Sequence, residues 1–234
     1  SGVKRFMDTT KENAKADGPL NFGRILYSFK GKVADVVIPE DVAIIEDYVF
    51  LGCDFIKSVT FSDSVEEIGL YAFQNCTNLK TVILPNTVTI IESNAFSNCL
   101  SLETITLPDS VTFVEEEIFL NCENLKNVKL SNKLGNISEK MFANCKNSFV
   151  EIILPDSVTL IEKGAFSRCI EIKKVVCPNY LEELGEEVFK YCLKLRQITL
   201  PKNVRTISEQ CFYGCESLEG LEICGEVEVI SKEA

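Results

Sequence analysis

The sequence predicts an α/β solenoid, a right-handed coil of repeats of about 23 residues with a parallel β-sheet on one face and short helical turns on the others. The first observation is that the pattern Phe-x-x-Cys occurs eight times, in steps of 23 residues apart from one step of 24. The second is that apolar residues recur at the same positions of every repeat, which indicates one continuous core. The pattern consists of Phe50, Phe73, Phe96, Phe119, Phe142, Phe166, Phe189 and Phe212, with Cys53, Cys76, Cys99, Cys122, Cys145, Cys169, Cys192 and Cys215.

Each repeat is expected to begin with a short strand. In the repeat 79–102, Val82 and Leu84 alternate with outward-facing neighbours, as in a strand with one buried face. Pro85 then ends the strand, because proline cannot donate to a continuing ladder. The inward strand positions along the chain are Val59/Phe61, Val82/Leu84, Ile105/Leu107, Val128/Leu130, Ile152/Leu154, Val175/Cys177, Ile198/Leu200 and Leu221/Ile223.

A second apolar pair follows each proline position, and a short helical turn is expected after it. In the same repeat Val88 and Ile91 point back to the core, and Glu92–Phe96 is predicted to form the helical turn. An acid near the start of a helix suits the helix dipole. Asn98 follows, where a residue that tolerates the left-handed conformation is favoured.

The cysteines are expected to form a column inside the stack. Neighbouring coils lie about 4.8 Å apart, within the Cα range of a disulfide, but side chains that project in parallel are poorly aimed to bridge. We therefore expect buried free thiols that behave as small apolar groups, with isolated disulfides and a metal site as the alternatives. Cys177 and Cys211 also fall on core positions, whereas Cys224 is expected to be exposed.

The single 24-residue step comes from one extra residue between Cys145 and Phe149. We expect it to bulge as a loop without breaking the stack, because the apolar pattern resumes at Ile152.

Two segments are expected along the chain. Residues 1–35 are predicted to be an N-terminal cap, a polar segment followed by a β-hairpin of residues 24–29 and 33–38. Residues 36–234 are predicted to be the solenoid, of about eight repeats. The next phenylalanine of the pattern would follow Ala234, so we expect the last repeat to be truncated.

Composition argues against several classes of function. A net charge of −11 disfavours nucleic acid, because nothing neutralises phosphates in bulk. No run approaches the roughly 18 apolar residues of a membrane span. The sequence has no histidine, the commonest general base and metal ligand, and no glycine-rich phosphate loop. We therefore expect no enzyme, no cofactor and no metal.

Acidic residues recur at one position just after the second apolar pair. The column comprises Glu46, Glu92, Glu115 and Glu162, with glycine or serine in the other repeats. A calcium-binding ridge and a solvated column of helix-start acids are the two interpretations, and the second is the simpler.

The outward positions of the strands are the expected binding surface, because a solenoid sheet presents them as parallel rows. Ile153 and Val176 belong to adjacent repeats and would form a small hydrophobic spot. Ordinary β-propensity is the competing explanation, since β-branched residues favour strands anyway. The candidate ligand-binding residues are Thr104, Thr106, Lys129, Ile153, Lys174, Val176 and Thr199.

The repeat resembles the BspA-like leucine-rich-repeat family, also called the Treponema pallidum type. That family's unit reads approximately L-x-x-I-x-[LI]-P-x-x-V-x-x-I-x-x-x-A-F-x-x-C, and residues 102–111 of this chain read Leu-Glu-Thr-Ile-Thr-Leu-Pro-Asp-Ser-Val. The resemblance covers residues 36–230. Departures are Ser62 and Ser131 in place of proline, Cys177 in a strand and Gly135 in a turn.

The resemblance implies a leucine-rich-repeat solenoid and a secreted or cell-surface protein, although a cytoplasmic location stays open. Members are commonly proteins of gut and oral bacteria and of some protozoa, implicated in binding host matrix proteins, other cells or glycans. Our first hypothesis is therefore a monomeric, non-enzymatic adhesion module that binds a protein or glycan partner without entering a membrane. The alternative is a structural spacer or assembly module within a larger multidomain protein.

Overall fold

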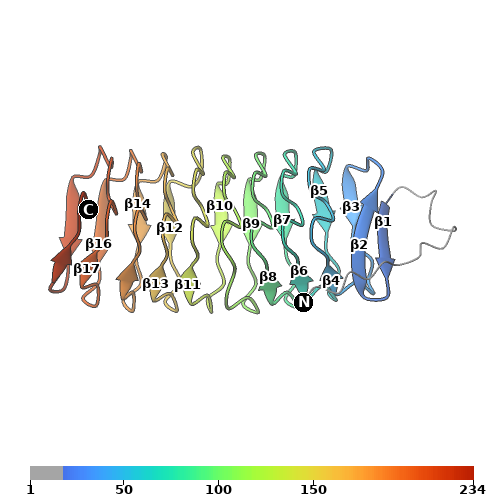
Figure 1. The fold of residues 1–234 in the computed structure, drawn as a ribbon, viewed down its shortest axis with the longest axis horizontal. Coiled ribbons are helices and arrows are strands. Elements are labelled where there is room, and N and C mark those ends of the chain that lie inside the picture. The colour runs from blue at the N-terminus through green and yellow to red at the C-terminus, as the bar shows by residue number, and fades with distance from the viewer. Residues whose placement is uncertain (1–17) are drawn as a thin grey trace.

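A computed structural model describes residues 18–234, and it confirms the solenoid (Figure 1). Nine coils stack along one axis, each contributing a strand to a first strand row. The strands are parallel and in register, so that Thr81 pairs with Thr104 and Thr104 with Asn127. The first row consists of β3 (Asp35–Val37), β5 (Ser58–Thr60), β7 (Thr81–Ile83), β9 (Thr104–Thr106), β10 (Asn127–Lys129), β12 (Glu151–Ile153), β14 (Lys174–Val176), β16 (Gln197–Leu200) and β18 (Gly220–Ile223).

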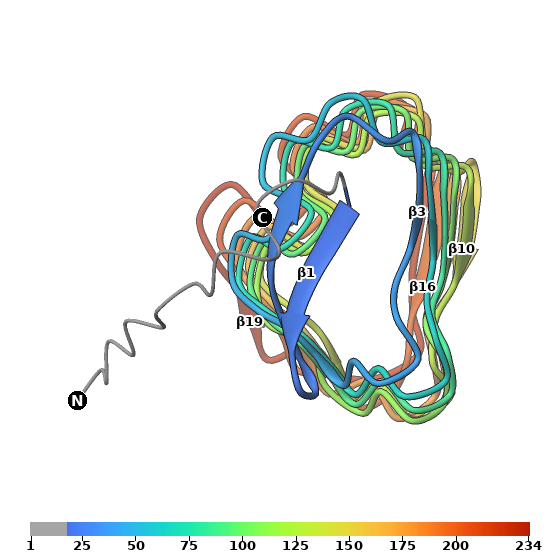
Figure 2. The same ribbon diagram turned by 90° about the vertical axis from the view of Figure 1, so that its right-hand side faces the viewer.

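A second strand row lies on the opposite side of the coil when the stack is viewed along its axis (Figure 2). Each of its strands contains the second residue of the apolar pair that follows a proline position, such as Ile91, and the strands are also parallel. The second row consists of β4 (Ile44–Ile45), β6 (Glu67–Ile68), β8 (Ile90–Ile91), β11 (Asn136–Ile137), β13 (Leu160–Ile161), β15 (Glu183–Leu184), β17 (Thr206–Ile207) and β19 (Val229–Ile230).

The N-terminal hairpin differs from the one expected. It is formed by β1 (Gly18–Phe22) and β2 (Ile25–Lys30), which pair antiparallel around a turn at Gly23, where φ is +57°. Residues 33–38 do not pair with β2; they contain β3, which begins the first row. Strand β2 instead joins the second row by pairing in parallel with β4. The expected polar segment lies in residues 1–17, outside the described residues.

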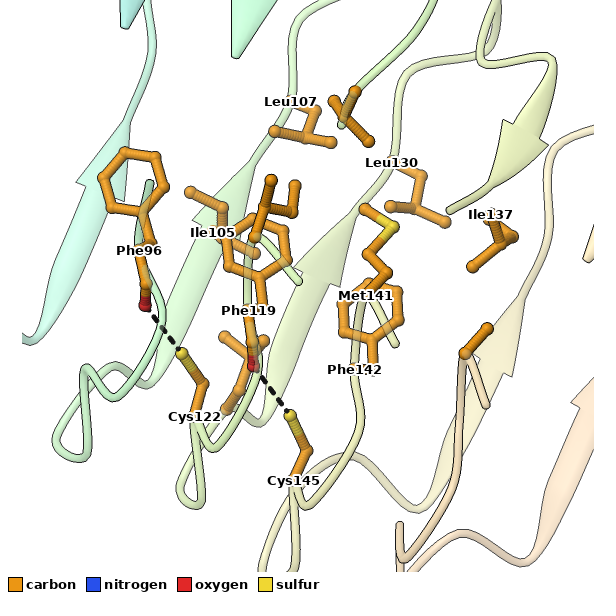
Figure 3. Packing of buried hydrophobic residues seen from close by; sticks show 14 of the residues in the cluster. Phe96, Ile105, Leu107, Phe119, Cys122, Leu130, Ile137, Met141, Phe142 and Cys145 are labelled. Carbon is orange, nitrogen blue, oxygen red and sulfur yellow. Dashed lines mark hydrogen bonds between the residues drawn. The ribbon is translucent and has the colours of Figure 1, made fainter. Parts of the chain in front are cut away.

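The core between the rows is a column of stacked phenylalanine rings. From Phe50 to Phe212 the rings of successive coils lie 4.7–6.0 Å apart between centroids, with interplanar angles of 5–22°. Phe50 to Phe189 are fully buried. Figure 3 shows three successive members of the column, Phe96, Phe119 and Phe142. The hairpin extends the column, because Phe29 packs against Phe50 at 5.0 Å.

The cysteine column is a series of free thiols within residues 18–234. Each buried thiol of the pattern donates a hydrogen bond to the main-chain oxygen of the phenylalanine one coil earlier, as in Cys122 to Phe96 and Cys145 to Phe119 (Figure 3). Cys211 is buried and Cys224 is exposed, as predicted, whereas Cys177 is only partly buried.

The expected helical turn over Glu92–Phe96 does not form. Asn94 and Asn98 have φ of +59° and +58°, and a left-handed residue at every fourth position stops a right-handed helix before it completes a turn. The N–H group of Phe96 donates to the carbonyl of Ile118 in the next coil at 3.1 Å, so this wall is held by bonds between coils. The left-handed conformation expected near Asn98 is confirmed.

Candidate functional site

The candidate residues of the strand face fall into three places. Thr104 and Thr106 lie on β9 beside Lys129 on β10, and Thr106 is the register partner of Lys129. Ile153 on β12 pairs with Val176 on β14, which confirms the expected adjacency of the two apolar residues. The structure therefore brings the first three residues together and the next two together.

Two of the predicted residues form polar contacts with side chains of neighbouring coils. Lys174 forms a salt bridge with Glu151 at 2.8 Å. Thr199 lies one coil further along on β16, and its hydroxyl donates a hydrogen bond to Glu222 at 3.0 Å. These contacts run along the stack and link adjacent coils. Exposed pairs of this kind contribute only about 0–1 kcal/mol to stability, so both side chains remain accessible to a ligand.

Apolar side chains face solvent near the middle of the first row. Ile153 is 68% exposed and Val150, just before β12, is 50% exposed. Val176 is partly buried beside Ile153. Ile83 on β7 is also 66% exposed, but it lies three coils from β12. The hydrophobic spot is therefore made by Ile153, Val150 and Val176.

The first strand row is interrupted beside this spot. One sheet runs from β3 to β10 and a second from β12 to β18, with no pairing between β10 and β12. We call this interruption the strand-row gap. It coincides with the extra residue between Cys145 and Phe149. Val128 on β10 is only partly buried, whereas its equivalent Ile105 is fully buried.

A shallow hollow of about 260 Å³ marks the strand-row gap. It is lined by polar side chains from both sides of the gap, and three of the predicted ligand-binding residues are among them. The lining residues include Thr104, Thr106, Lys126, Asn127, Lys129 and Glu151. Sequence reasoning selected the two threonines and Lys129 but missed Lys126, Asn127 and Glu151. The 24-residue step was the signal that could have found them, because an inserted residue must disturb the neighbouring ladder.

The acidic column has a structural role that neither interpretation anticipated. The carboxylate of Glu115 accepts a hydrogen bond from the N–H of Ser93 at 3.0 Å, and Glu92 does the same for Leu70. Burial raises the pKa of Glu92, and the neighbouring Asp47 raises it further. Glu92, Glu115 and Glu162 thus each accept a hydrogen bond from a main-chain N–H of the preceding coil. Within residues 18–234 no group of three acidic or thiol side chains is placed to hold a metal ion.

The thiols are poor candidates for chemistry. Burial raises the pKa of the Cys99, Cys122 and Cys192 thiols well above the ordinary value, and the thiolate is the reactive form. Their S–H groups also donate hydrogen bonds to main-chain carbonyl oxygens. Among residues 18–234 there is no helix of the length and apolar character that crossing a bilayer requires.

Three solved structures of bacterial repeat proteins are similar to this chain. A leucine-rich-repeat protein from Bacteroides ovatus is 27% identical with a TM-score of 0.69, covering 90% of this chain and 67% of that one. A repeat protein from Eubacterium ventriosum is 20% identical with a TM-score of 0.54, covering 88% and 66%. The Treponema pallidum leucine-rich-repeat protein is 25% identical with a TM-score of 0.47, covering 85% and 73%.

A search of curated proteins finds no match. The family described as "BspA type Leucine rich repeat region" matches residues 22–148 and 136–234, with six copies of the repeat. These two matches span most of the sequence, and the stacked coils, the phenylalanine column and the parallel rows are the fold expected of such repeats. The chain belongs to the BspA-type leucine-rich-repeat family.

Proposed function

We propose that the protein is a non-enzymatic binding module that recognises a protein or glycan partner through the first strand row. The observation that carries the proposal is the exposed apolar spot of Ile153, Val150 and Val176 beside the polar hollow of the strand-row gap. The stack does not need these apolar side chains, because they point away from the phenylalanine column. Apolar anchors beside a polar rim are typical of interfaces.

The proposal includes a location at the cell surface or outside the cell, as the family resemblance implies, and a monomeric state. A rigid row of coils suits recognition of an extended surface, because each coil adds a parallel row of outward side chains. Transient or adhesive contacts of this kind need no catalytic group. The membrane is not a partner in this proposal.

Direct binding measurements test the proposal. Purified extracellular-matrix proteins and an array of glycans serve as probes for the wild-type protein and for Ile153→Ala, Val176→Ala and Lys174→Ala. We expect a partner whose affinity falls roughly fivefold to tenfold for at least one of the apolar variants, as at buried anchors of interfaces. Ile83→Ala is the matched control, since Ile83 is equally exposed on β7. Wild-type affinity in all three variants contradicts recognition through this part of the face.

An assembly module is the second candidate, and the last coil favours it. Val229 and Ile230 on β19 are 50% and 69% exposed, although Ile207, the equivalent of Ile230 one coil earlier, is buried. Another coil or a second copy could cover them. Sedimentation over a range of concentrations tests this function. Self-association that Ile230→Lys abolishes supports it, and a monomer at every concentration contradicts it.

A further inference from the structure

The main chain at the strand-row gap is left without the hydrogen bonds that other coils make. The carbonyl oxygen of Glu103 accepts from Lys126 N at 3.0 Å, and that of Val150 accepts from Lys173 N at 2.7 Å. The equivalent carbonyl of Lys126 accepts no main-chain hydrogen bond from residues 18–234. The carbonyls that are engaged at this position in other coils are those of Ala34, Lys57, Lys80, Glu103, Val150, Lys173 and Arg196.

The opposite side of the gap is equally unpaired. The N–H groups of Val150 and Glu151 correspond to those of Lys126 and Asn127, both of which donate to Glu103. In the part of the chain that the structure describes, neither Val150 nor Glu151 donates a main-chain hydrogen bond outside its own strand, and β12 pairs only with β14 on its other edge. One acceptor and two donors thus face the gap.

The extra residue explains why the ladder opens here. In a regular coil Leu102 N bonds to the carbonyl of Cys99 in the same coil at 3.0 Å. Its counterpart Phe149 bonds instead to Leu125 of the preceding coil at 3.0 Å. Phe149 also stands edge-on to Phe142, with centroids 5.5 Å apart at 86°. The chain therefore enters β12 from a displaced position.

A buried hydroxyl at the gap has no partner. Ser148 is 5% exposed, and its Oγ forms no hydrogen bond within the described residues. Native proteins rarely leave such a group unsatisfied. Ser148 lines a second hollow of about 450 Å³, together with Lys126, Phe149 and Val150. That volume is in the range of roughly 300–1,000 Å³ in which proteins hold ligands.

The β10 side of the gap is basic although the chain as a whole is acidic. Residues 124–138 contain three lysines and no acidic residue, in a chain of net charge −11. Lys126 and Lys129 form no ion pair within residues 18–234. The acids on the rim are already neutralised, Glu151 by Lys174 and Glu171 by Lys194.

We propose that the strand-row gap binds an extended acidic peptide segment of a partner protein. Its main chain pairs with the carbonyl of Lys126 and the N–H groups of Val150 and Glu151, in the manner of strand addition to an open sheet edge. Its carboxylates lie against Lys126 and Lys129. This inference rests on the proposed function and specifies the partner as a peptide.

The test uses a synthetic peptide of alternating glutamate and valine as the probe. We expect the double variant Lys126→Ala/Lys129→Ala to weaken its binding about fivefold, and added salt to weaken wild-type binding. The control Lys57→Ala/Lys80→Ala removes lysines from coils whose ladder is closed, and its affinity should equal wild type. Equal loss in both double variants, or none in either, overturns the assignment of the site.

Two further measurements test the main-chain pairing. Hydrogen exchange at Val150 and Glu151 should slow when the peptide binds, and a peptide with N-methylated main chain should bind at least tenfold more weakly. An unchanged exchange rate at both residues overturns strand addition. Selective binding of a glycan in place of the peptide, with the same loss in the lysine variants, overturns the peptide as the occupant.

Deletion of Ser148 restores the 23-residue step and supplies a final check. We expect it to close the ladder between β10 and β12 and to abolish peptide binding; a folded deletion variant that still binds the peptide overturns the proposal. If the deletion variant does not fold, the lysine variants still test the proposal, because Lys126 and Lys129 are exposed and their replacement should leave the fold intact. Partner binding that is lost in Ile153→Ala and retained in the lysine variants contradicts this inference alone and leaves the proposed function in place.

Discussion

The thiol of Cys122 donates a hydrogen bond to the main-chain carbonyl oxygen of Phe96, with Sγ and oxygen 3.2 Å apart. The two residues lie 26 positions apart in the sequence, one coil plus the three residues of the Phe-x-x-Cys pattern. Phe96 also belongs to the column of stacked rings. The pattern therefore joins consecutive coils twice, through the ring of its phenylalanine and through the thiol of its cysteine.

Replacement of Cys122 should show both roles of the thiol. We expect Cys122→Ala to lower the free energy of unfolding by about 1–2 kcal/mol, through the lost hydrogen bond and a small cavity. Cys122→Ser should lower the free energy of unfolding by at least as much. The C–O bond is shorter than the C–S bond, so the hydroxyl lies further from the Phe96 carbonyl and is left buried without a hydrogen bond. Urea denaturation measures both changes. A Cys122→Ser protein as stable as wild type would contradict the geometry.

The phenylalanine column should dominate the stability of the central coils. Phe119 is fully buried between Phe96 and Phe142, so Phe119→Ala should lower the free energy of unfolding by roughly 3–5 kcal/mol. The control lies in the same coil, where Phe113 is 55% exposed and Phe113→Ala should change stability by less than about 1 kcal/mol. Calorimetry on both variants checks the contrast, and equal effects would contradict the assignment of the column.

The period alone was enough to predict the coil and its core. A side chain that recurs every 23 residues must occupy the same place in each coil, so the rings and thiols from Phe50 to Cys215 could be assigned inward without any structure. The same logic located the outward strand positions, including Thr106 and Lys129. It could not predict the short helical turn correctly, because Asn94 is as compatible with a helix as with the left-handed turn it adopts.

The errors at the hairpin and at the gap have a common physical cause. The pairing of β-strands depends on which strand edges lie side by side in the folded chain, and a local sequence pattern does not contain that information. Residues 33–38 form a strand as expected, but their partner is β5. At the gap the extra residue was expected to bulge harmlessly, and the loss of pairing between β10 and β12 was not foreseen. The site beside Lys126 was missed for the same reason.

A branched side chain should not be tolerated at a left-handed position. Asn144 has φ of +60°, in a column of such residues one coil apart that includes Asn121. We expect Asn144→Val to lower the free energy of unfolding by about 1–2 kcal/mol, because a β-branched residue is strained there. Asn144→Gly should lower the free energy of unfolding by less than Asn144→Val, since glycine adopts positive φ without strain. Denaturation midpoints of the two variants provide the measurement, and a reversed order would contradict the conformation.

High pH should destabilise the protein through its buried thiols. Burial raises the pKa of Cys215 from 9.0 to about 11 and raises that of Cys122 well above its ordinary value. Below pH 9 the thiols are protonated in both states, so their contribution is fully present. Above pH 9 the unfolded chain loses these protons and the folded protein keeps them, so the free energy of unfolding falls as pH rises through the folded pKa.

Cys122→Ala isolates the contribution of one thiol. Between pH 9 and 10.5 its free energy of unfolding should fall less steeply than that of wild type, with the difference approaching about 1.4 kcal/mol per pH unit as the unfolded thiol ionises. Comparison of the two proteins cancels the titration of lysines and tyrosines. Thr199→Ala, which removes an exposed group that does not ionise, should keep the wild-type slope. Urea titrations across this range supply the data, and parallel slopes for wild type and Cys122→Ala would mean that Cys122 is not buried as a thiol.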